Sequence, residues 1–245
     1  MRYITALTAL SLAYSSSVAF DELQLGLVGF ADSKPYKSVS SEAQLFPFIK
    51  ARYGMVYFEG LDFGVDAWEN ERVALKAGIS LGTYGYKAKD GAYLSGMKTK
   101  RPSLDGDFRA KVTLSKTSYL TIRLSPDISN QHNGYGASAQ YTNVLFQKDA
   151  HHLSGFIKAE YLSDKKADYY FGVASKESSA ERKAYKVGNA INPSVGINYA
   201  YALSKHWTFL GGVKYVHLDS TIYKSPLVED HEDISAYLGF MYRFF

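Results

Sequence analysis

The sequence predicts an all-β fold, namely a transmembrane antiparallel β-barrel of about 12 strands that follows a cleaved signal peptide. Three observations predict it. The first residues are typical of an export signal, apolar and polar residues alternate along nearly all of the remaining chain, and the last alternating segment ends in aromatic residues. After the export signal there is no further run of the roughly 20 apolar residues that a spanning helix needs. Residence in a membrane therefore requires a closed barrel, because an open sheet leaves backbone groups unpaired in lipid.

The N-terminal segment has the three parts of a secretory signal peptide. Arg2 supplies the positive charge, residues 4–12 form a short and mostly apolar core, and Ser17-Val18-Ala19 places small residues before a cleavage site. We therefore expect cleavage after Ala19, which divides the chain into a signal peptide, residues 1–19, and one barrel domain, residues 20–245. A folded N-terminal helix is the alternative for this segment.

The alternation of apolar and polar residues divides the barrel domain into strands, because a strand turns successive side chains to opposite faces. In the segment 107–115, for example, apolar residues at even positions alternate with Arg109, Lys111 and Thr113. An even number of strands returns both termini to the periplasmic side. If the two short segments 55–60 and 61–68 merge, the number becomes ten. We expect strands at residues 22–31, 43–53, 55–60, 61–68, 72–84, 105–115, 118–127, 134–146, 151–162, 192–203, 206–218 and 234–245.

The connections between these segments fall into two classes by length. Outer-membrane barrels have short periplasmic turns and long extracellular loops. The segregation of loop lengths and the long strands favour a barrel over a soluble β-sandwich, which is the alternative that alternation by itself leaves open. The short connections are at 69–71, 116–117, 147–150 and 204–205, and the long ones are at 32–42, 85–104, 163–191 and 219–233.

The last strand has one apolar face, made by Ile234, Ala236, Leu238, Phe240, Tyr242 and Phe244. We expect this face to meet lipid and the aromatic strand end to be recognised by the barrel-assembly machinery. The chain has 21 Tyr and 14 Phe, and aromatic residues suit the membrane–water interfaces. The candidates for such aromatic girdles are Tyr53, Trp68, Tyr84, Trp207 and Tyr215.

Charge and cysteine content exclude some classes of protein. The formal charge is +4, and removal of the signal peptide takes away Arg2 and no acid, so 27 basic and 24 acidic residues leave +3. This small excess does not predict a nucleic-acid partner. Because there is no cysteine, there is no disulfide framework, which is compatible with export through the periplasm.

The inward face of the barrel is where a channel or ligand site would lie. A basic excess in a narrow lumen would favour anions, whereas an internal network of ion pairs would fill a small barrel. We favour the ion-paired network. By parity the inward basic residues are Lys50, Arg52, Lys76, Arg109, Lys111, Arg123, Lys158, Lys214 and Arg243, and the inward acids are Glu59, Asp62, Asp66, Asp107 and Glu160.

The segment His151-His152-Leu153-Ser154 is a candidate for catalysis, because outer-membrane lipid hydrolases use a His–Ser pair with the histidine as base. Asp149 and Glu160 are the acids nearby in sequence. However, the alternation turns His152 and Ser154 toward the lumen, whereas a lipid hydrolase needs them at the bilayer. A polar pair of histidines near a turn is the favoured interpretation.

Two charged loops are candidates for binding. The acidic segment 229–233, which contains His231, has hard oxygen ligands for a divalent cation, although a solvated acidic loop is favoured. The basic segment 98–101 would contact anionic lipopolysaccharide, or it is an ordinary soluble loop. We assign no residue to catalysis, to a cofactor or to a metal.

Several short segments, in order along the chain, resemble the MipA/OmpV family of outer-membrane proteins. Each is short, and together they extend over almost all of the barrel domain. The terminal Phe245 follows the usual Tyr-x-Phe ending and is a departure from the family pattern. The segments are Asp32-Ser33-Lys34-Pro35-Tyr36-Lys37, residues 46–54, residues 56–60, Leu94-Ser95-Gly96-Met97, residues 169–173, Ala184-Tyr185, Ser225-Pro226-Leu227-Val228 and Tyr242-Arg243-Phe244.

The resemblance implies a barrel in the outer membrane of a Gram-negative cell, with no catalytic activity and no cofactor. It further implies a scaffolding role in which the partners are a lytic transglycosylase and a peptidoglycan synthase of the cell envelope. A narrow pore or a barrel for ligand uptake or adhesion is the first alternative, and a lipid hydrolase is the second.

Overall fold

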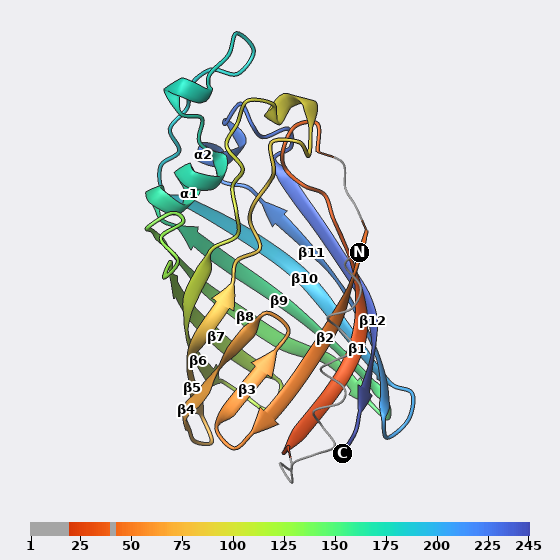
Figure 1. Ribbon diagram of the computed structural model, residues 1–245. Coiled ribbons are helices and arrows are strands. Elements are labelled where there is room, and N and C mark those ends of the chain that lie inside the picture. The colour runs from red at the N-terminus through yellow and green to blue at the C-terminus, as the bar shows by residue number, and fades with distance from the viewer. Residues whose placement is uncertain (1–19, 40–42) are drawn as a thin grey trace, which may run out of the picture.

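The computed structural model describes residues 20–39 and 43–245, and these residues form a closed antiparallel barrel of twelve strands (Figure 1). The predicted signal peptide, residues 1–19, lies outside the described residues. Each strand pairs with its neighbours in sequence, and β12 closes the barrel on β1 with Leu27 opposite Phe240. The strands are β1 Glu22–Asp32, β2 Gln44–Tyr53, β3 Val56–Glu59, β4 Asp62–Glu69, β5 Val73–Leu81, β6 Leu104–Thr113, β7 Ser118–Pro126, β8 Tyr135–Lys148, β9 His151–Leu162, β10 Ala190–Ala202, β11 Trp207–His217 and β12 Glu232–Arg243.

The predicted strands are confirmed, with boundaries that differ by a few residues. The segments predicted at 55–60 and 61–68 form two separate short strands, β3 and β4, so twelve strands are present and not ten. The largest difference at a strand end is in β5, which ends at Leu81, whereas the alternation predicts a strand to residue 84. Tyr84 leaves the barrel wall because its ring packs against Phe171 of another loop.

The two faces of each strand differ as the alternation predicts. On β12, Leu238 is 62% exposed on the outside of the barrel, whereas Met241 is 3% exposed on the inside. Large apolar side chains thus cover the outer surface of the wall, as lipid requires and as a soluble sandwich does not. In the part of the chain that the structure describes, no helix is long and apolar enough to cross a membrane.

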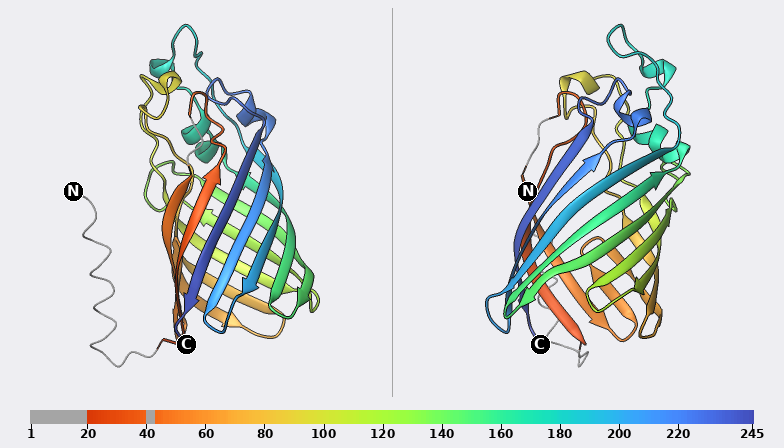
Figure 2. Two further views of the ribbon diagram at one scale, coloured as in Figure 1. Left: turned by 90° about the vertical axis from the view of Figure 1, so that its right-hand side faces the viewer. Right: turned by 180° about the vertical axis from the view of Figure 1, so that it is seen from behind.

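Short and long connections lie at opposite ends of the barrel (Figure 2). The turns at 54–55, 70–72, 114–117, 149–150 and 203–206 lie at the end where β12 finishes and β1 begins. By the usual orientation of such barrels this end is periplasmic and the other is extracellular. The long connections at 33–39, 82–103, 163–189 and 218–231 lie at the extracellular end, together with the loop 127–134.

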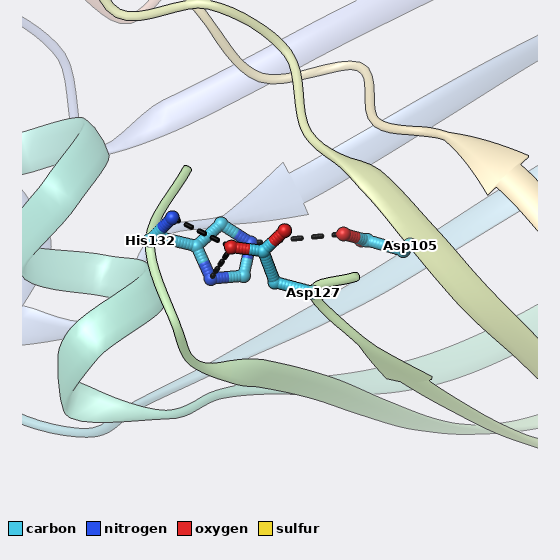
Figure 3. A group of neighbouring side chains, drawn as sticks. All are labelled: Asp105, Asp127 and His132. Atoms are coloured by element: carbon cyan, nitrogen blue, oxygen red, sulfur yellow. Dashed lines mark hydrogen bonds and ion pairs between the residues drawn. The ribbon is translucent and has the colours of Figure 1, made fainter. Parts of the chain in front are cut away.

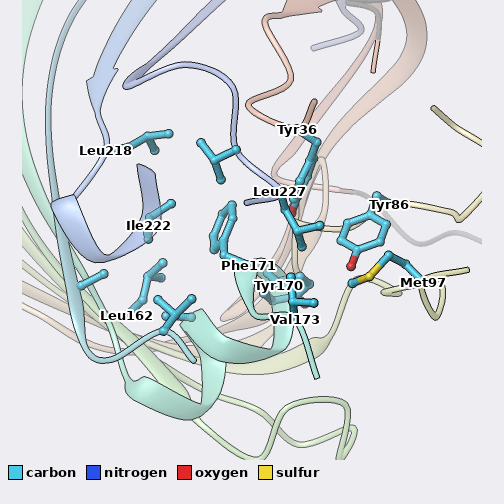
Figure 4. Packing of buried hydrophobic residues seen from close by; sticks show 14 of the residues in the cluster. Tyr36, Tyr86, Met97, Leu162, Tyr170, Phe171, Val173, Leu218, Ile222 and Leu227 are labelled. Atoms are coloured by element: carbon cyan, nitrogen blue, oxygen red, sulfur yellow. The ribbon is translucent and has the colours of Figure 1, made fainter. Parts of the chain in front are cut away.

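The long connections pack on one another as a plug over the extracellular mouth, which we call the cap (Figure 4). Every one of them contributes to a single buried apolar cluster, which includes Tyr36, Leu94, Phe171 and Leu227. Because the outside of a membrane barrel faces lipid and the inside is largely polar, the cap is where this chain buries most of its apolar side chains away from any solvent. The connection lengths predict these segments as long loops, and the structure adds that the loops pack on one another.

The helix α1, Asp164–Phe171, anchors the cap to the barrel rim. Ala167, Tyr170 and Phe171 are buried at positions i, i+3 and i+4, so they share the face that turns toward the cluster. The helix is preceded by Ser163, whose hydroxyl accepts a hydrogen bond from the backbone N–H of Tyr135 on β8. The remaining helical elements of the cap are single turns, namely α2 Ser220–Tyr223, η2 Ala92–Leu94 and η3 Ser175–Glu177.

Most of the segments that resemble the MipA/OmpV family lie in the cap. Tyr36, Leu94, Phe171 and Leu227 come from different segments of that set and meet in the buried cluster. Segments that look unrelated along the chain are therefore parts of one packed unit. The exceptions are the C-terminal strand end and the residues of β2 and β3.

Candidate functional site

The lumen beneath the cap is the candidate site, and its wall has a charged half and an apolar half. The charged half is formed by β2 to β7, where the residues predicted to face inward meet as ion pairs. Asp107, whose side chain is 0% exposed, contacts both Arg109 and Arg123, with 2.6 Å between Arg123 Nε and an oxygen of Asp107. Arg109 also pairs with Asp62 on β4.

The same half continues toward the periplasmic side around Asp66. This carboxylate pairs with Arg52 and lies 3.4 Å from Lys76 Nζ. The ammonium group of Lys76 in addition lies over the ring of Tyr57, 4.3 Å from its centroid. The cations of this half therefore have acidic or aromatic partners, as the ion-paired interpretation of the inward charges expects. The arrangement offers little unbalanced positive charge to attract an anion.

The apolar half of the lumen is formed by β10 to β12, β1 and β2, and it encloses a cavity of about 400 Å³. Val28, Phe30, Phe48, Tyr237 and Met241 supply its apolar lining. Polar groups meet them at one side of the cavity, and the hydroxyl of Tyr237 donates to the side chain of Asn198 at 2.9 Å. The polar residues of the lining include Gln24, Lys50, Glu59, His152 and Asn198.

Sequence analysis did not single out this apolar lining. Alternation assigns apolar faces to lipid and polar faces to the lumen, and in the extracellular halves of β1 and β2 both faces are apolar. The run Leu45-Phe46-Pro47-Phe48-Ile49 contains the available signal, because it does not alternate at all. A run that is apolar on both faces indicates a strand whose inner face is also dry.

At the rim of the barrel, a buried polar cluster joins the wall to the cap (Figure 3). Asp105 on β6 lies 3.0 Å from Lys166 Nζ of α1 and 3.7 Å from the ring of His132 in loop 127–134. His132 Nδ1 lies 3.7 Å from Asp127 at the start of that loop. The cluster thus connects β6, the loop and α1.

Asp105, Asp127 and His132 are close enough to suggest a metal site, and they form the one such group that a search of the described residues finds. Their hydrogen bonds do not fit one. The backbone N–H of Gly134 donates to His132 Nδ1 at 3.0 Å, which places the ring proton on Nε2, the nitrogen that faces Asp105. The ammonium of Lys166 already neutralises Asp105. The cluster is a structural lock between wall and cap.

Asp127 organises its loop, and its charge gives that loop a dependence on pH. Burial opposes ionisation, but hydrogen bonds from the Ser129 hydroxyl and from the backbone N–H groups of Asn133, His132 and Ser129 lower the pKa of Asp127 to about 2. A lowered pKa means that the ionised form stabilises the fold. The contribution is fully present above the ordinary value of 3.8 and is lost as the pH falls through about 2.

We therefore expect loop 127–134 to open between pH 4 and pH 2 in the wild-type protein, measured as a loss of protection against amide hydrogen exchange at His132 and Asn133, relative to the intrinsic rate at each pH. Asp127→Asn should give fast exchange at both pH values, because the amide oxygen is a weaker acceptor than the carboxylate. Asp149→Asn, in a turn at the opposite end, is the matched control and should leave the exchange of this loop unchanged. If the protection of His132 and Asn133 against amide exchange is the same at pH 4 and pH 2 in the wild type, the role of Asp127 is contradicted.

The histidines proposed for catalysis are not arranged as a hydrolase site. His151 Nδ1 is hydrogen-bonded to the hydroxyl of Tyr199 at 2.6 Å. His152 lines the lumen cavity, and Ser154 is buried on the same side of β9. Among the described residues, no hydrogen bond joins His152 to Ser154, to Asp149 or to Glu160. His152 and Ser154 thus lie on the lumen face, away from the bilayer.

The charged loops have partners within the protein. In the acidic segment, Glu232 accepts a hydrogen bond from the hydroxyl of Tyr215, and the ring of His231 packs on that of Tyr223 at 4.2 Å between centroids. In the basic segment, Lys100 Nζ lies over the ring of Tyr169 in the cap. These contacts tie both segments to their neighbours.

Of the residues predicted to form aromatic girdles, Tyr53, Trp68 and Trp207 are exposed on the outside near strand ends. Tyr84 is not a girdle residue. Its ring packs against Tyr170 and Phe171 in the cap, and its hydroxyl donates to Glu160 at 3.2 Å. The prediction for Tyr84 is wrong because the strand ends three residues earlier than the alternation suggests.

The chain matches known proteins over almost its full barrel domain. The family described as "MltA-interacting protein MipA" matches residues 25–244. The MltA-interacting protein of Escherichia coli (strain K12) is 24% identical over 95% of this chain and 95% of its own length. The outer membrane protein OmpV of Vibrio cholerae is 29% identical over 70% of each chain.

A further relative, the outer membrane protein Omp26La of Vibrio anguillarum, is 30% identical over 62% of this chain, and the match spans 60% of the length of Omp26La. Among solved structures, a KdgM porin aligns with 90% of this chain and 99% of its own, with 11% identity and a TM-score of 0.45. A likeness of that size does not bear on function.

Proposed function

Since this chain belongs to the MipA family and is an outer-membrane β-barrel, we propose that it is a non-enzymatic structural protein that scaffolds peptidoglycan machinery. The partner we propose first is a lytic transglycosylase, with a peptidoglycan synthase as the second. The printed name of the E. coli relative, MltA-interacting protein, supports such an association, and that relative aligns with 95% of this chain.

The observation that carries the proposal is the closed extracellular mouth. The cap fills it with packed side chains, among which Tyr170, Phe171 and Leu94 are fully buried. Below the cap, the charges of the lumen are largely paired. A barrel built as an open channel would have neither feature, whereas a scaffold needs only a stable anchor in the membrane and accessible periplasmic turns.

The surface that a periplasmic partner can contact is the periplasmic rim of the barrel, which is formed by the short turns. These turns carry exposed charges, such as Glu69, Glu71 and Lys116, and only isolated apolar side chains, namely Met55, Leu114 and Leu203. We therefore expect weak and salt-sensitive contacts, because exposed charges are screened by salt and small interfaces bind weakly. The barrel would gather its partners by holding them near the membrane and not by tight binding to a pocket.

The test is co-purification of a lytic transglycosylase with variants of the barrel at low and high salt. Substitution of the turns at 70–72, 114–117 and 203–206 should abolish binding. Deletion of residues 175–183 in the extracellular loop, which leaves α1 in place, is the matched control and should not affect it. Loss of binding on the loop deletion, with silent turn substitutions, would place the function outside the cell and favour the alternative of a receptor or uptake barrel.

A second expectation concerns conductance. We expect the refolded wild-type protein to be silent in planar bilayers because the cap closes the mouth. Phe171→Ala should remove about 3–5 kcal/mol from the packing of the cap, as truncation of a buried aromatic residue generally does. We expect this variant to show faster proteolysis of the long loops and an intermittent current. Its barrel should remain folded, as judged by heat-modifiability on a gel. Phe245→Ala, at the exposed C-terminus, is the control. Steady current through the wild type would overturn a closed scaffold and favour the pore.

A further inference from the structure

The barrel wall is incomplete beside β2. The β3–β4 hairpin turns back at Gly60-Leu61, at the level of Ile49, so residues 44–48 of β2 extend above it (Figure 1). Its last backbone hydrogen bonds run from Gly60 N to the carbonyl of Ile49 and from Leu81 N to the carbonyl of Leu61. Among the described residues, no strand pairs with the first half of β2, residues 44–48, on the side away from β1.

Residues at the open edge have the composition of an edge and not of a paired strand. The backbone groups of Ile49 point toward β3, and such groups alternate along a strand, so those of Pro47 are the next to point toward the open side. Proline has no N–H, so the edge has one donor fewer that would need a partner. The sequence is therefore suited to an edge at this position.

A close contact with β2 determines the level of the wall at which the β3–β4 hairpin turns. Gly60 has a φ of +61°, and a Cβ atom on it would lie 2.7 Å from the ring of Phe48. Only glycine combines this backbone conformation with that approach. The hairpin thus turns where Phe48 meets it, and the wall above stays open.

The open edge leads to an apolar surface inside the barrel. Residues 44–47 are all exposed, with Leu45 at 67%. The inward ring of Phe46 lies 5.9 Å from that of Phe30, which in turn lies 6.0 Å from that of Tyr237. Phe30 and Tyr237 line the cavity of about 400 Å³. A continuous row of aromatic rings thus joins the opening to the cavity.

The other directions out of the cavity are less suited to an apolar molecule. The cap closes the extracellular side with a packed cluster. The facing half of the lumen is lined by ion pairs, and an apolar molecule that passed them would have to displace well-paired charges and their water. The volume of the cavity is within the range of about 300–1,000 Å³ that is usual for small-molecule sites.

From these observations we propose that the opening beside β2 is a lateral passage through which the single alkyl chain of an amphipathic molecule enters the lumen cavity from the membrane. In the cavity, the alkyl chain of this molecule lies against Phe30, Val28 and Met241, and its polar head lies near Lys50 and Asn198. Because no described strand pairs with β2 at this level on the side away from β1, the alkyl chain enters without breaking backbone hydrogen bonds between strands of the wall. The site is independent of the periplasmic turns, so this role is separate from the scaffolding proposed above.

The test uses photolabelling of the barrel refolded in phosphatidylcholine vesicles, with labelled residues identified by mass spectrometry. One arm uses a phosphatidylcholine that carries a diazirine at the end of one acyl chain, which reaches the lumen only from the side. The other uses a diazirine-labelled dodecanol, which reaches it by any route. We expect both probes to label Phe30 and Tyr237 in the lumen, in addition to Leu27 and Leu238 on the outer surface.

Val28→Trp fills the cavity and should cause loss of label at Tyr237 while label at Leu238 remains. Leu27→Trp, on the neighbouring outward position of β1, is the matched control and should retain both. Heat-modifiability on a gel shows whether each variant is folded. Met241→Trp is a second variant that fills the cavity, and it should give the same loss of label as Val28→Trp. Label confined to outer residues with both probes would overturn the site, and lumen label from dodecanol without lumen label from the phospholipid would overturn the lateral passage.

Discussion

Leu238→Arg is expected to prevent stable insertion of the barrel into liposomes. Leu238 lies in the middle of the last strand, 62% exposed on the outer face, and it stands opposite Gly29 on β1 at the closing seam. An arginine on the lipid face near the bilayer midplane costs about 2–4 kcal/mol. This cost destabilises the pairing of β12 with β1, which closes the barrel. We therefore expect the protein to fail to fold and not only to fold more slowly. The readout is the folded fraction by gel shift after refolding into vesicles.

The control for this prediction is Ser235→Arg, which places the same charge on the lumen face of the same strand. It should be tolerated much better than Leu238→Arg because the lumen is polar at the position of its partner Lys214. Ile234→Arg, one residue away and outward, separates the effect of facing from that of depth and should lie between the two. Equal tolerance of Leu238→Arg and Ser235→Arg would show that the facing of β12 is wrong.

Asp107→Asn is expected to destabilise the folded barrel more than any other single loss of charge in the lumen. The Asp107 side chain is 0% exposed and accepts from Arg109 and Arg123, so its removal leaves the two guanidinium groups with Asp62 as their remaining shared acid. Breaking a buried ion pair costs about 3–5 kcal/mol. Because the Arg123 side chain is 32% exposed, we expect a value of about 3 kcal/mol, near the lower limit of that range.

The measurement is the free energy of unfolding in urea, with the barrel in liposomes. The double variant Asp107→Asn with Arg123→Gln should recover part of the loss, since it leaves Asp62 with one arginine to balance and not two. Glu59→Gln, at a lumen-facing position outside the pairs around Asp107, is the comparison and should have a smaller effect. If the single and double variants are equally unstable, the two residues are not coupled and the network does not support the barrel as argued.

The cap and the lumen suggest why this chain is so rich in tyrosine. A membrane barrel has no apolar interior of the ordinary kind, so loops that must close its mouth need side chains that are large and apolar but also have a polar end. Tyr84 and Tyr170 meet both needs, because their rings pack together while their hydroxyls bond to Glu160 and to groups at Ser103. The described tyrosines thus occur at the membrane interface, in the cap and, as Tyr57 and Tyr237 do, in the lumen.

Local sequence was enough to predict the barrel and the facing of its residues. The alternation of one apolar and one polar position is imposed by the pleat of a strand that has lipid on one side and a polar lumen on the other. Arg109 and Asp107, two residues apart on β6, were therefore placed in the lumen correctly from parity. The strand count followed from the turns, because even the short strands β3 and β4 carry their own Gly60-Leu61 turn.

Packing between distant segments decided the rest. Nothing in the residues around Tyr36, Tyr86 and Phe171 shows that their rings pack together, because the three come from different loops and meet only when the barrel brings the loop ends together. Tyr84 was assigned to the wrong environment for the same reason. The opening beside β2 likewise depends on the height at which β3 and β4 stop relative to their neighbours, and that height is a property of pairing registers and not of any one strand.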